Sequence, residues 1–232
     1  MNVVQVTPPE GLSLTLGGEK LWLLPERALW WPAQQAVVVA DVHLGKDAVF
    51  RRQGLAIPKG GAGSDLARLT QLIRRHDAAR LLVLGDWLHA APRASEDWTP
   101  ELLAWRDTHA DLEFSWVVGN HDRRIETLAV QLNAHCLEEA RSLNGLALCH
   151  EPPERLDRPS LCGHWHPVLR LQTGARTRQR LPAFWLAGHR LVLPAFGSLT
   201  GGHPIQGAPT DRTWVTDGTT VFEWPPSPRS KR

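Results

Sequence analysis

Residues 36–43 read A-V-V-V-A-D-V-H, a continuous apolar run that ends in an acid and a histidine two positions apart. An apolar run without polar alternation is typical of a strand that is buried on both faces. Asp41 and His43 follow the run directly, and carboxylates and imidazoles are common ligands of divalent metals. The stretch therefore predicts a central strand with metal ligands at its carboxyl end, where a bend is needed before both side chains reach one ion.

The same arrangement recurs four more times along the chain. Each recurrence is an apolar run followed at once by carboxylate, amide or imidazole side chains. The runs cover residues 81–84, 114–118, 146–149 and 160–162, and they lead to Gly85-Asp86, Gly119-Asn120-His121-Asp122, His150 and Gly163-His164-Trp165-His166. Because these groups are spread so widely, they can form one site only if the strands converge in one fold.

Helical patterns separate the predicted strands. Ser64 is expected to cap a helix that ends near His76. A second helix is expected to open near Thr99-Pro100-Glu101, with the cap, an early proline and an early acid, and a third to cover residues 123–133. Residues 12–31 and 184–224 are rich in strand patterns. Alternating strands and helices predict α/β architecture, in which ligands gather beyond the carboxyl ends of the strands.

Composition narrows the protein class. The chain has 232 residues, a formal charge of +2 and three cysteines, an odd number that gives no disulfide framework. Its start lacks the pattern of a signal peptide, and no apolar stretch approaches the roughly 20 residues of a membrane span. We expect one domain over residues 1–224, a disordered basic tail over 225–232, a cytoplasmic location and no membrane partner.

The donor types predict the metal chemistry. Mixed nitrogen and oxygen ligands suit manganese, iron or zinc better than calcium or magnesium, and donor type does not choose among those three. Two such ions about 3.5–4 Å apart clamp a phosphoryl group and generate a hydroxide nucleophile near neutral pH. The candidate donors are Asp41, His43, Asp86, Asn120, His150, His164 and His166.

His121 is the candidate catalytic residue. It follows Asn120 and can face the substrate, where a protonated imidazole could donate to the leaving oxygen. We expect Asp122 to hold His121 in the right tautomer or to keep it charged. Any one of these histidines alone would more often be structural. Their order, each after a buried strand, makes coincidence a poor explanation.

The ordered set D-x-H, G-D, G-N-H-D, H and G-H-x-H resembles the calcineurin-like metallophosphoesterase superfamily. The resemblance implies a four-layer αββα sandwich, in which two mixed β-sheets are flanked by helices. It also implies that one metal is held by Asp41, His43, Asp86 and His166, and the other by Asp86, Asn120, His150 and His164. Asp86 would bridge the two ions, and His121 would face the substrate.

A narrower likeness lies between the ligand blocks. Residues 41–46, 50–54, 85–90, 150–152 and 194–202 are similar to the bacterial DNA ligase-associated metallophosphoesterases. That group implies a manganese-dependent phosphodiesterase or DNA endonuclease, associated with a ligase, a helicase and an exonuclease in DNA repair. Trp87-Leu88 departs mildly from the group, which usually shows leucine and phenylalanine after Gly-Asp.

The basic residues carry the substrate hypothesis. Lys46, Arg51, Arg52, Arg123 and Arg124 are candidate phosphate contacts. In a strand, Arg176, Arg178 and Arg180 would share one face, and such a face binds nucleic-acid backbone without reading sequence. The opposing interpretation is that these are solvated surface arginines.

Two other functions remain open at this point. The same metal core serves phosphoesterases for small nucleotides, sugar phosphates or phosphoproteins, and a scaffold could use the fold without catalysis. A mononucleotide enzyme should show a closed pocket, and a DNA enzyme should show an open groove lined by arginines. A scaffold should have lost metal ligands, and none is missing here.

Overall fold

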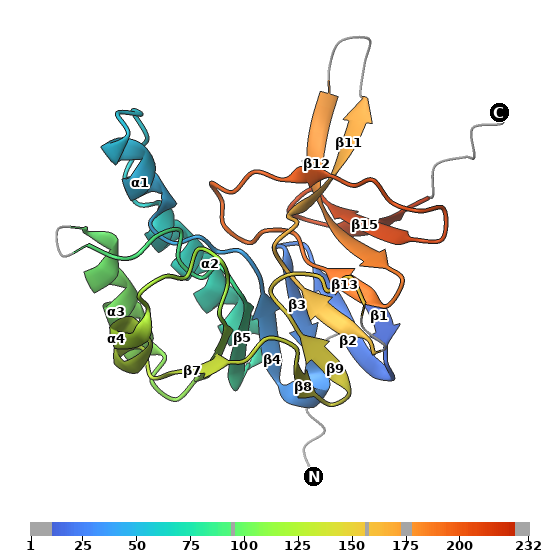
Figure 1. Cartoon of the computed structure of the whole chain (residues 1–232), viewed down its shortest axis with the longest axis horizontal. Coiled ribbons are helices and arrows are strands. Elements are labelled where there is room, and N and C mark those ends of the chain that lie inside the picture. Colours follow the sequence, from blue (N-terminus) through green and yellow to red (C-terminus); the bar gives the residue numbers. More distant parts are fainter. Residues whose placement is uncertain (1–10, 94–95, 156–157, 173–177, 226–232) are drawn as a thin grey trace.

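The computed structural model describes residues 11–93, 96–155, 158–172 and 178–225. Two mixed β-sheets lie against each other with helices beside them, which confirms the predicted α/β class (Figure 1). The ends of the chain, with most of the predicted tail, and Arg176 lie outside the described residues. None of the helices that the structure describes combines the length and the hydropathy of a membrane span.

The first sheet has the order β1-β2-β3-β4-β5-β6-β7. Strands β1 to β4 pair antiparallel and β4 to β7 pair parallel, so four carboxyl ends meet at one edge. The bounds are β1 Leu12–Leu16, β2 Glu19–Leu24, β3 Ala28–Trp31, β4 Ala36–Val39, β5 Arg80–Leu84, β6 Glu113–Val117 and β7 Ala134–Leu137, with a short 3-10 turn, η1, at Pro32–Gln34.

The second sheet has the order β14-β11-β12-β13-β10-β9-β8, and β15 and β16 extend it from β12. Strand β10 pairs parallel with both β9 and β13, which brings the ends of β9 and β10 together. The bounds are β8 Arg141–Leu143, β9 Leu146–Leu148, β10 Ser160–Cys162, β11 Pro167–Gln172, β12 Arg178–Ala187, β13 Arg190–Val192, β14 His203–Pro204, β15 Arg212–Thr216 and β16 Val221–Trp224.

The described α-helices all lie in connections of the first sheet, and Figure 1 shows them gathered on the side away from the second sheet. They are α1 Lys46–Arg52, α2 Gly61–His76, α3 Trp98–Thr108 and α4 Glu126–Gln131. No α-helix from the described residues follows α4, so the helical layer belongs to the first sheet.

The three predicted helices are present, but each begins slightly away from its predicted start. Helix α2 begins after Gly60, whose φ of 96° only glycine adopts readily, so Ser64 lies inside the helix rather than at its cap. Helix α3 begins at Trp98, which places Thr99 and Pro100 inside its first turn. Helix α4 begins at Glu126, after Arg124 turns the chain with a φ of 55°.

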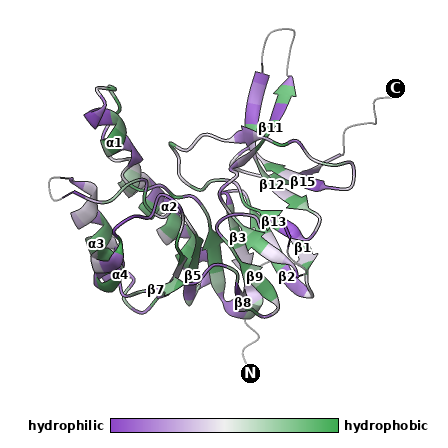
Figure 2. Cartoon of the chain, in the orientation of Figure 1, coloured by the Kyte–Doolittle hydropathy of each residue, from purple (hydrophilic) through white to green (hydrophobic). Residues whose placement is uncertain are grey.

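Strand β4 has a separate core on each face. Val37 and Val39 pack with the helices, whereas Val38 and Ala40 pack with residues of the second sheet. Figure 2 shows the hydrophobic colour along β3 and β5 as well. Each buried valine contributes roughly 1.5–3 kcal/mol. Because one of these cores joins both sheets, it fixes their strand ends relative to each other.

Candidate metal centre

The backbone turns sharply where the strands deliver their polar residues. Asp41, His43, Asp86, His164 and His166 all have positive φ values, of 54°, 52°, 50°, 67° and 44°. Residues other than glycine rarely adopt this left-handed conformation, and when they do, they often lie at functional sites. The turns supply the bend that the D-x-H spacing requires, so that neighbouring side chains point into one space.

Asp41, His43 and His166 form the first cluster. One possible ligand atom from each lies within 4.8 Å of the others. His166 Nε2 is 3.2 Å from Asp41 Oδ1, and His43 Nε2 is 3.7 Å from Asp86 Oδ2. Residues far apart in sequence therefore meet with the short separations that shared coordination of one ion requires.

Asp86, His150 and His164 form the second cluster, again with ligand atoms within 4.8 Å of one another. Asn120 Oδ1 lies 2.9 Å from His150 Nε2 and 3.1 Å from His164 Nδ1, and His150 Nε2 is 3.6 Å from Asp86 Oδ2. Asp86 thus contacts both clusters, as a bridging carboxylate would.

The residues present fit divalent cations. His150 Nδ1 lies 3.1 Å from the carbonyl oxygen of Leu84, which can only accept, so the ring proton sits on Nδ1. The Nε2 lone pair then faces Asn120 Oδ1, which is an acceptor too, and a cation between them resolves that repulsion. Such a backbone contact is the usual way to orient a metal-bound imidazole.

Two buried imidazole nitrogens give independent support. His43 Nε2 and His166 Nε2 are buried and have no hydrogen-bond partner among the described residues. Burial lowers the pKa of His43 to about 2, and the nearby Lys46 charge adds to the effect. His43 is therefore neutral near pH 7, and its lone pair is available to a metal ion.

Glycines let these ligands approach the strands. A Cβ added to Gly85 would lie 2.1 Å from His150 Nδ1, and one added to Gly119 would lie 2.3 Å from Asp86 Oδ1. Both distances are far below van der Waals contact. Both glycines are thus needed for space, and Gly85, with a φ of 79°, is also needed for the turn.

His121 lies beside the second cluster with its ring held in place. Its backbone N–H donates to Asp86 Oδ1 at 2.8 Å, and its Nδ1 lies 3.1 Å from the carbonyl oxygen of His89. The rings of His89 and His121 stack with centroids 5.1 Å apart. His89 was missed as a site residue, although it stands in the quoted stretch 85–90. The His89 carbonyl oxygen can only accept, so the proton of a neutral His121 ring sits on Nδ1.

Asp122 does not contact His121 as expected. The carboxylate accepts hydrogen bonds from the Leu88 N–H, the Trp116 indole N–H and the Gly119 N–H, at 2.8–2.9 Å. Burial raises its pKa to about 6. Asp122 therefore ties together the loops after β5 and β6. Sequence adjacency suggested the pairing, but the turn sends the two side chains apart.

Two of the five candidate phosphate contacts form ion pairs with acidic residues. Arg51 pairs with Asp47 at 2.9 Å, and Arg52 pairs with Glu96. Lys46 is half-buried, and burial lowers its pKa while Asp41 and Asp86 oppose that shift. Lys46 is thus close enough to Asp41 and Asp86 to interact with their charges.

The other basic residues are exposed. Arg123 Nε lies 3.5 Å from the Asn120 carbonyl oxygen, and Arg124 precedes α4. Arg178 and Arg180 lie on β12, where Arg180 is opposite Arg170 of β11. Arg180 also lines a cavity that includes His166, so this part of the predicted basic face reaches towards the centre.

A match to a family model agrees with this geometry. Residues 35–171 match the model described as calcineurin-like phosphoesterase. The chain belongs to the calcineurin-like phosphoesterase family. It is accordingly a metal-dependent phosphoester hydrolase, and the expected family, fold class and enzyme class are confirmed. The family uses divalent metals, and the His/Asp clusters above are able to bind them.

Similar proteins refine the picture of this phosphoesterase. The crystal structure of the Pseudomonas putida nuclease MPE matches with a TM-score of 0.79 and 36% identity, over 92% of this chain and 100% of that chain. A phosphoesterase from E. coli, Yfce, matches with a TM-score of 0.41 and 17% identity, over 83% of this chain and 93% of that chain. No curated protein matches this sequence.

Proposed function

We propose that this phosphoesterase hydrolyses phosphodiester bonds of DNA and uses a dinuclear metal centre. The observation that carries the proposal is the convergence of seven nitrogen and oxygen donors, in two clusters that share Asp86, in a chain similar along 92% of its length to a nuclease. The partly basic surface beside His166, with Arg180, fits an extended polyanion.

The ligand assignment follows the two clusters. Asp41, His43, Asp86 and His166 would hold one ion, and Asp86, Asn120, His150 and His164 the other. Their mixed donors suit manganese, with iron or zinc as alternatives. When bound, the pair supplies a hydroxide nucleophile and neutralises charge on the phosphoryl oxygens.

His121 would move the proton that the reaction requires. Because its Nδ1 faces the His89 carbonyl oxygen, only Nε2 can present a proton to the substrate. The protonated ring would donate from Nε2 to the departing alkoxide. The backbone hydrogen bond to Asp86 holds His121 next to the shared carboxylate, so the proton donor and the phosphoryl site stay in register.

The biological setting follows from the narrower likeness. We propose a role in bacterial DNA repair, in association with a ligase, a helicase and an exonuclease. A cytoplasmic location fits the three free thiols, Cys136, Cys149 and Cys162.

An activity panel tests the proposal. Protein loaded with manganese, iron or zinc would be assayed on bis-p-nitrophenyl phosphate, a phosphomonoester, cyclic nucleotides, and linear and circular DNA. We expect cleavage of DNA and of the aryl diester, fastest with manganese, and about two ions per chain by elemental analysis. Cleavage of small esters without any cleavage of DNA would reject the nuclease assignment.

A small-nucleotide phosphoesterase is the second candidate. A cavity of about 540 Å³ opens beside Asn120 and His164, which falls within the usual size of ligand pockets. Hydrolysis of cyclic or mononucleotides at rates above those for DNA would favour this function.

A further inference from the structure

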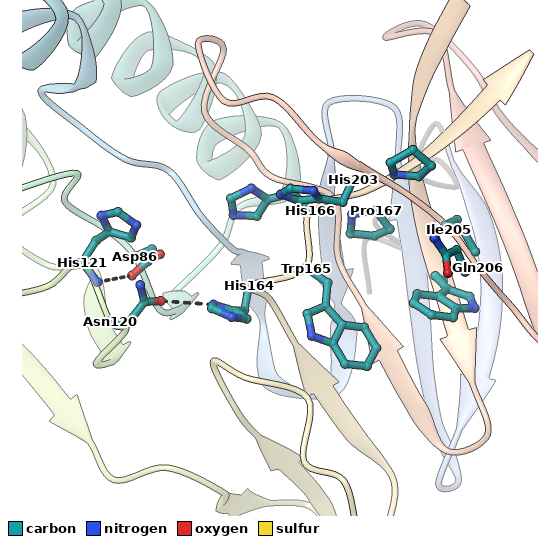
Figure 3. Close-up of a pocket in the computed structure, with 12 residues that line it drawn as sticks. Asp86, Asn120, His121, His164, Trp165, His166, Pro167, His203, Ile205 and Gln206 are labelled. Atoms are coloured by element: carbon teal, nitrogen blue, oxygen red, sulfur yellow. Dashed lines mark hydrogen bonds between the residues drawn. The ribbon is translucent and has the colours of Figure 1, made fainter.

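The cavity of about 540 Å³ at the metal centre has two chemically different ends, which Figure 3 shows side by side. Asp86, Asn120, His121 and His164 stand at one end, and Trp165 and its neighbours at the other. The other lining residues are His166, Pro167, Trp185, His203, Pro204, Ile205 and Gln206. A molecule whose phosphate meets the first end extends the rest of its structure over the second.

The apolar end is an aromatic wall. The rings of Trp165 and Trp185 have centroids 5.3 Å apart and an interplanar angle of 39°. Trp165 stands between His164 and His166, and both tryptophans are only partly buried. An indole that is partly exposed beside a reaction centre offers a flat surface on which another ring can stack.

Hydrogen bonds keep this wall rigid. The Trp185 indole N–H donates to Asp211 Oδ2 at 3.0 Å. On the facing segment, the His203 N–H donates to the His166 carbonyl oxygen at 2.9 Å, and the Ile205 N–H donates to the Val168 carbonyl oxygen at 3.0 Å. The wall is therefore formed in advance, so a ligand does not bear the entropy cost of ordering it.

The charges of the residues that line the cavity determine which chemical groups can bind in it. Among the described residues, no lysine or arginine lines the cavity, and the acid, Asp86, stands at the metal end. A second phosphate would therefore meet no described lysine or arginine on the aromatic wall. A neutral planar group does not need such a charge in order to bind there. A separate cavity on the other side of Asn120 is lined by Glu139, Glu151 and Glu154, which would repel a polyanion.

We propose that the aromatic wall binds the nucleobase of the nucleotide next to the scissile phosphate, stacked on Trp165. The proposal rests on the proposed function, because it assumes a nucleic-acid substrate. A base inside a duplex is already stacked and paired, so the base must be unpaired to reach the wall. The enzyme therefore prefers single-stranded DNA, loops or frayed ends. His203 and Gln206 also line the cavity and supply polar atoms to it.

Base-free nucleotides test the wall directly. Manganese-loaded protein would be given single-stranded oligothymidylates that carry one base-free sugar, and the cuts would be mapped to each position. We expect cleavage on one side of the base-free sugar to fall by about 5- to 150-fold, the range for a lost base–aromatic stack. Equal cleavage at thymidine and base-free positions would overturn the proposal.

Variants of Trp165 give a second readout. With manganese-loaded protein, at a temperature too low for cleavage during the measurement, fluorescence anisotropy would measure binding of labelled oligothymidylate to wild type, Trp165→Ala, Trp165→Phe and Trp22→Ala. We expect Trp165→Ala to weaken binding by about 5- to 150-fold and to lose the distinction between thymidine and base-free sites. Trp165→Phe should restore both. Trp22, half-buried on β2, lines no part of the cavity and should change neither.

The outcomes separate the two proposals. If wild type cuts no DNA yet hydrolyses aryl diesters, the proposed function fails and the base site fails with it. If wild type cuts DNA but tolerates base-free sites, or if Trp165→Ala binds as wild type does, only the base site fails. If Trp165→Ala does not fold, the base-free oligonucleotides on wild type still decide.

Discussion

The two sheets contribute differently to the metal centre where they meet. Asp41, His43 and Asp86 of the first sheet are buried, whereas His164 and His166 of the second sheet are half-buried beside the cavity. The contrast does not extend to every ligand, since Asn120, after β6 of the first sheet, is exposed and His150, after β9 of the second sheet, is buried. The first sheet supplies the buried carboxylates, so removing Asp86 should do more damage than removing the half-buried His166.

The largest effect is expected from Asp86→Ala. Asp86 contacts both clusters, so its loss should remove both ions and essentially all hydrolysis, whereas His166→Ala should lose one ion and keep the other. Elemental analysis and diesterase assays measure both outcomes. Asp107→Ala, on an exposed face of α3, is the control. Two ions retained in Asp86→Ala would contradict the shared carboxylate.

His121→Gln should slow catalysis without loss of metal. The side chain lies beside Asp86 but is assigned to the substrate, so kcat should fall by about 10²–10⁴-fold, as for a lost proton donor. Metal content and oligonucleotide binding should match wild type. His135→Gln, exposed on β7, serves as the control. Unchanged turnover of an aryl diester would exclude the assigned role.

Two core leucines separate the sheets as sources of stability. Leu66 packs between the helices and the first sheet, and Leu148 packs between the sheets next to His150. Either change to alanine should lower the free energy of unfolding by about 2–5 kcal/mol, measured in denaturant. Only Leu148→Ala should also weaken metal affinity, because it loosens the packing between the two sheets that carry the ligands. Equal metal affinity in both variants would show that the centre does not depend on how the sheets pack.

The smallest effect concerns pH and lies far from the centre. His76 stacks on Trp30 of the first sheet, and burial lowers its pKa to about 4. The unfolded chain takes up this proton near pH 6.5, so native stability should fall as pH drops from about 6.5 to about 4. His76→Gln should flatten that slope in denaturant titrations, and His189→Gln, exposed after β12, should not. An unaltered slope would assign the acid sensitivity to other groups.

The sequence predicted the strands well where an apolar run was enough to identify them. The runs that end at Asp41, Asp86 and Asn120 are buried strands because their apolar residues face a core on both sides. Helix α1 was missed, since it follows Gly45 and has no apolar repeat along residues 46–52. The short strand β14 was missed too. It is a strand only because it pairs with β11, and no local sequence pattern predicts that pairing.

The site was predictable as a set of donors but less so as a set of contacts. Donor type and order pointed to the residues that the structure brings together in both clusters, because the type of donor atom depends on the residue type alone. The partners of Asp122 and the carbonyl contact of His121 depend on how two loops lie against each other. The aromatic wall was missed for the same reason, since Trp185 and His203 join Trp165 only through the sheet.

The left-handed turns at Asp41, His43, Asp86, His164 and His166 have an evolutionary consequence. At each of these positions a residue other than glycine adopts a conformation that glycine adopts with less strain. The strain lowers the stability of the fold by roughly 1–3 kcal/mol per residue. Metal binding offsets that cost only while the ion is present. Selection for thermal stability alone would favour glycine at these positions. The fold would then become more stable, but the metal ligands and the catalytic activity would be lost.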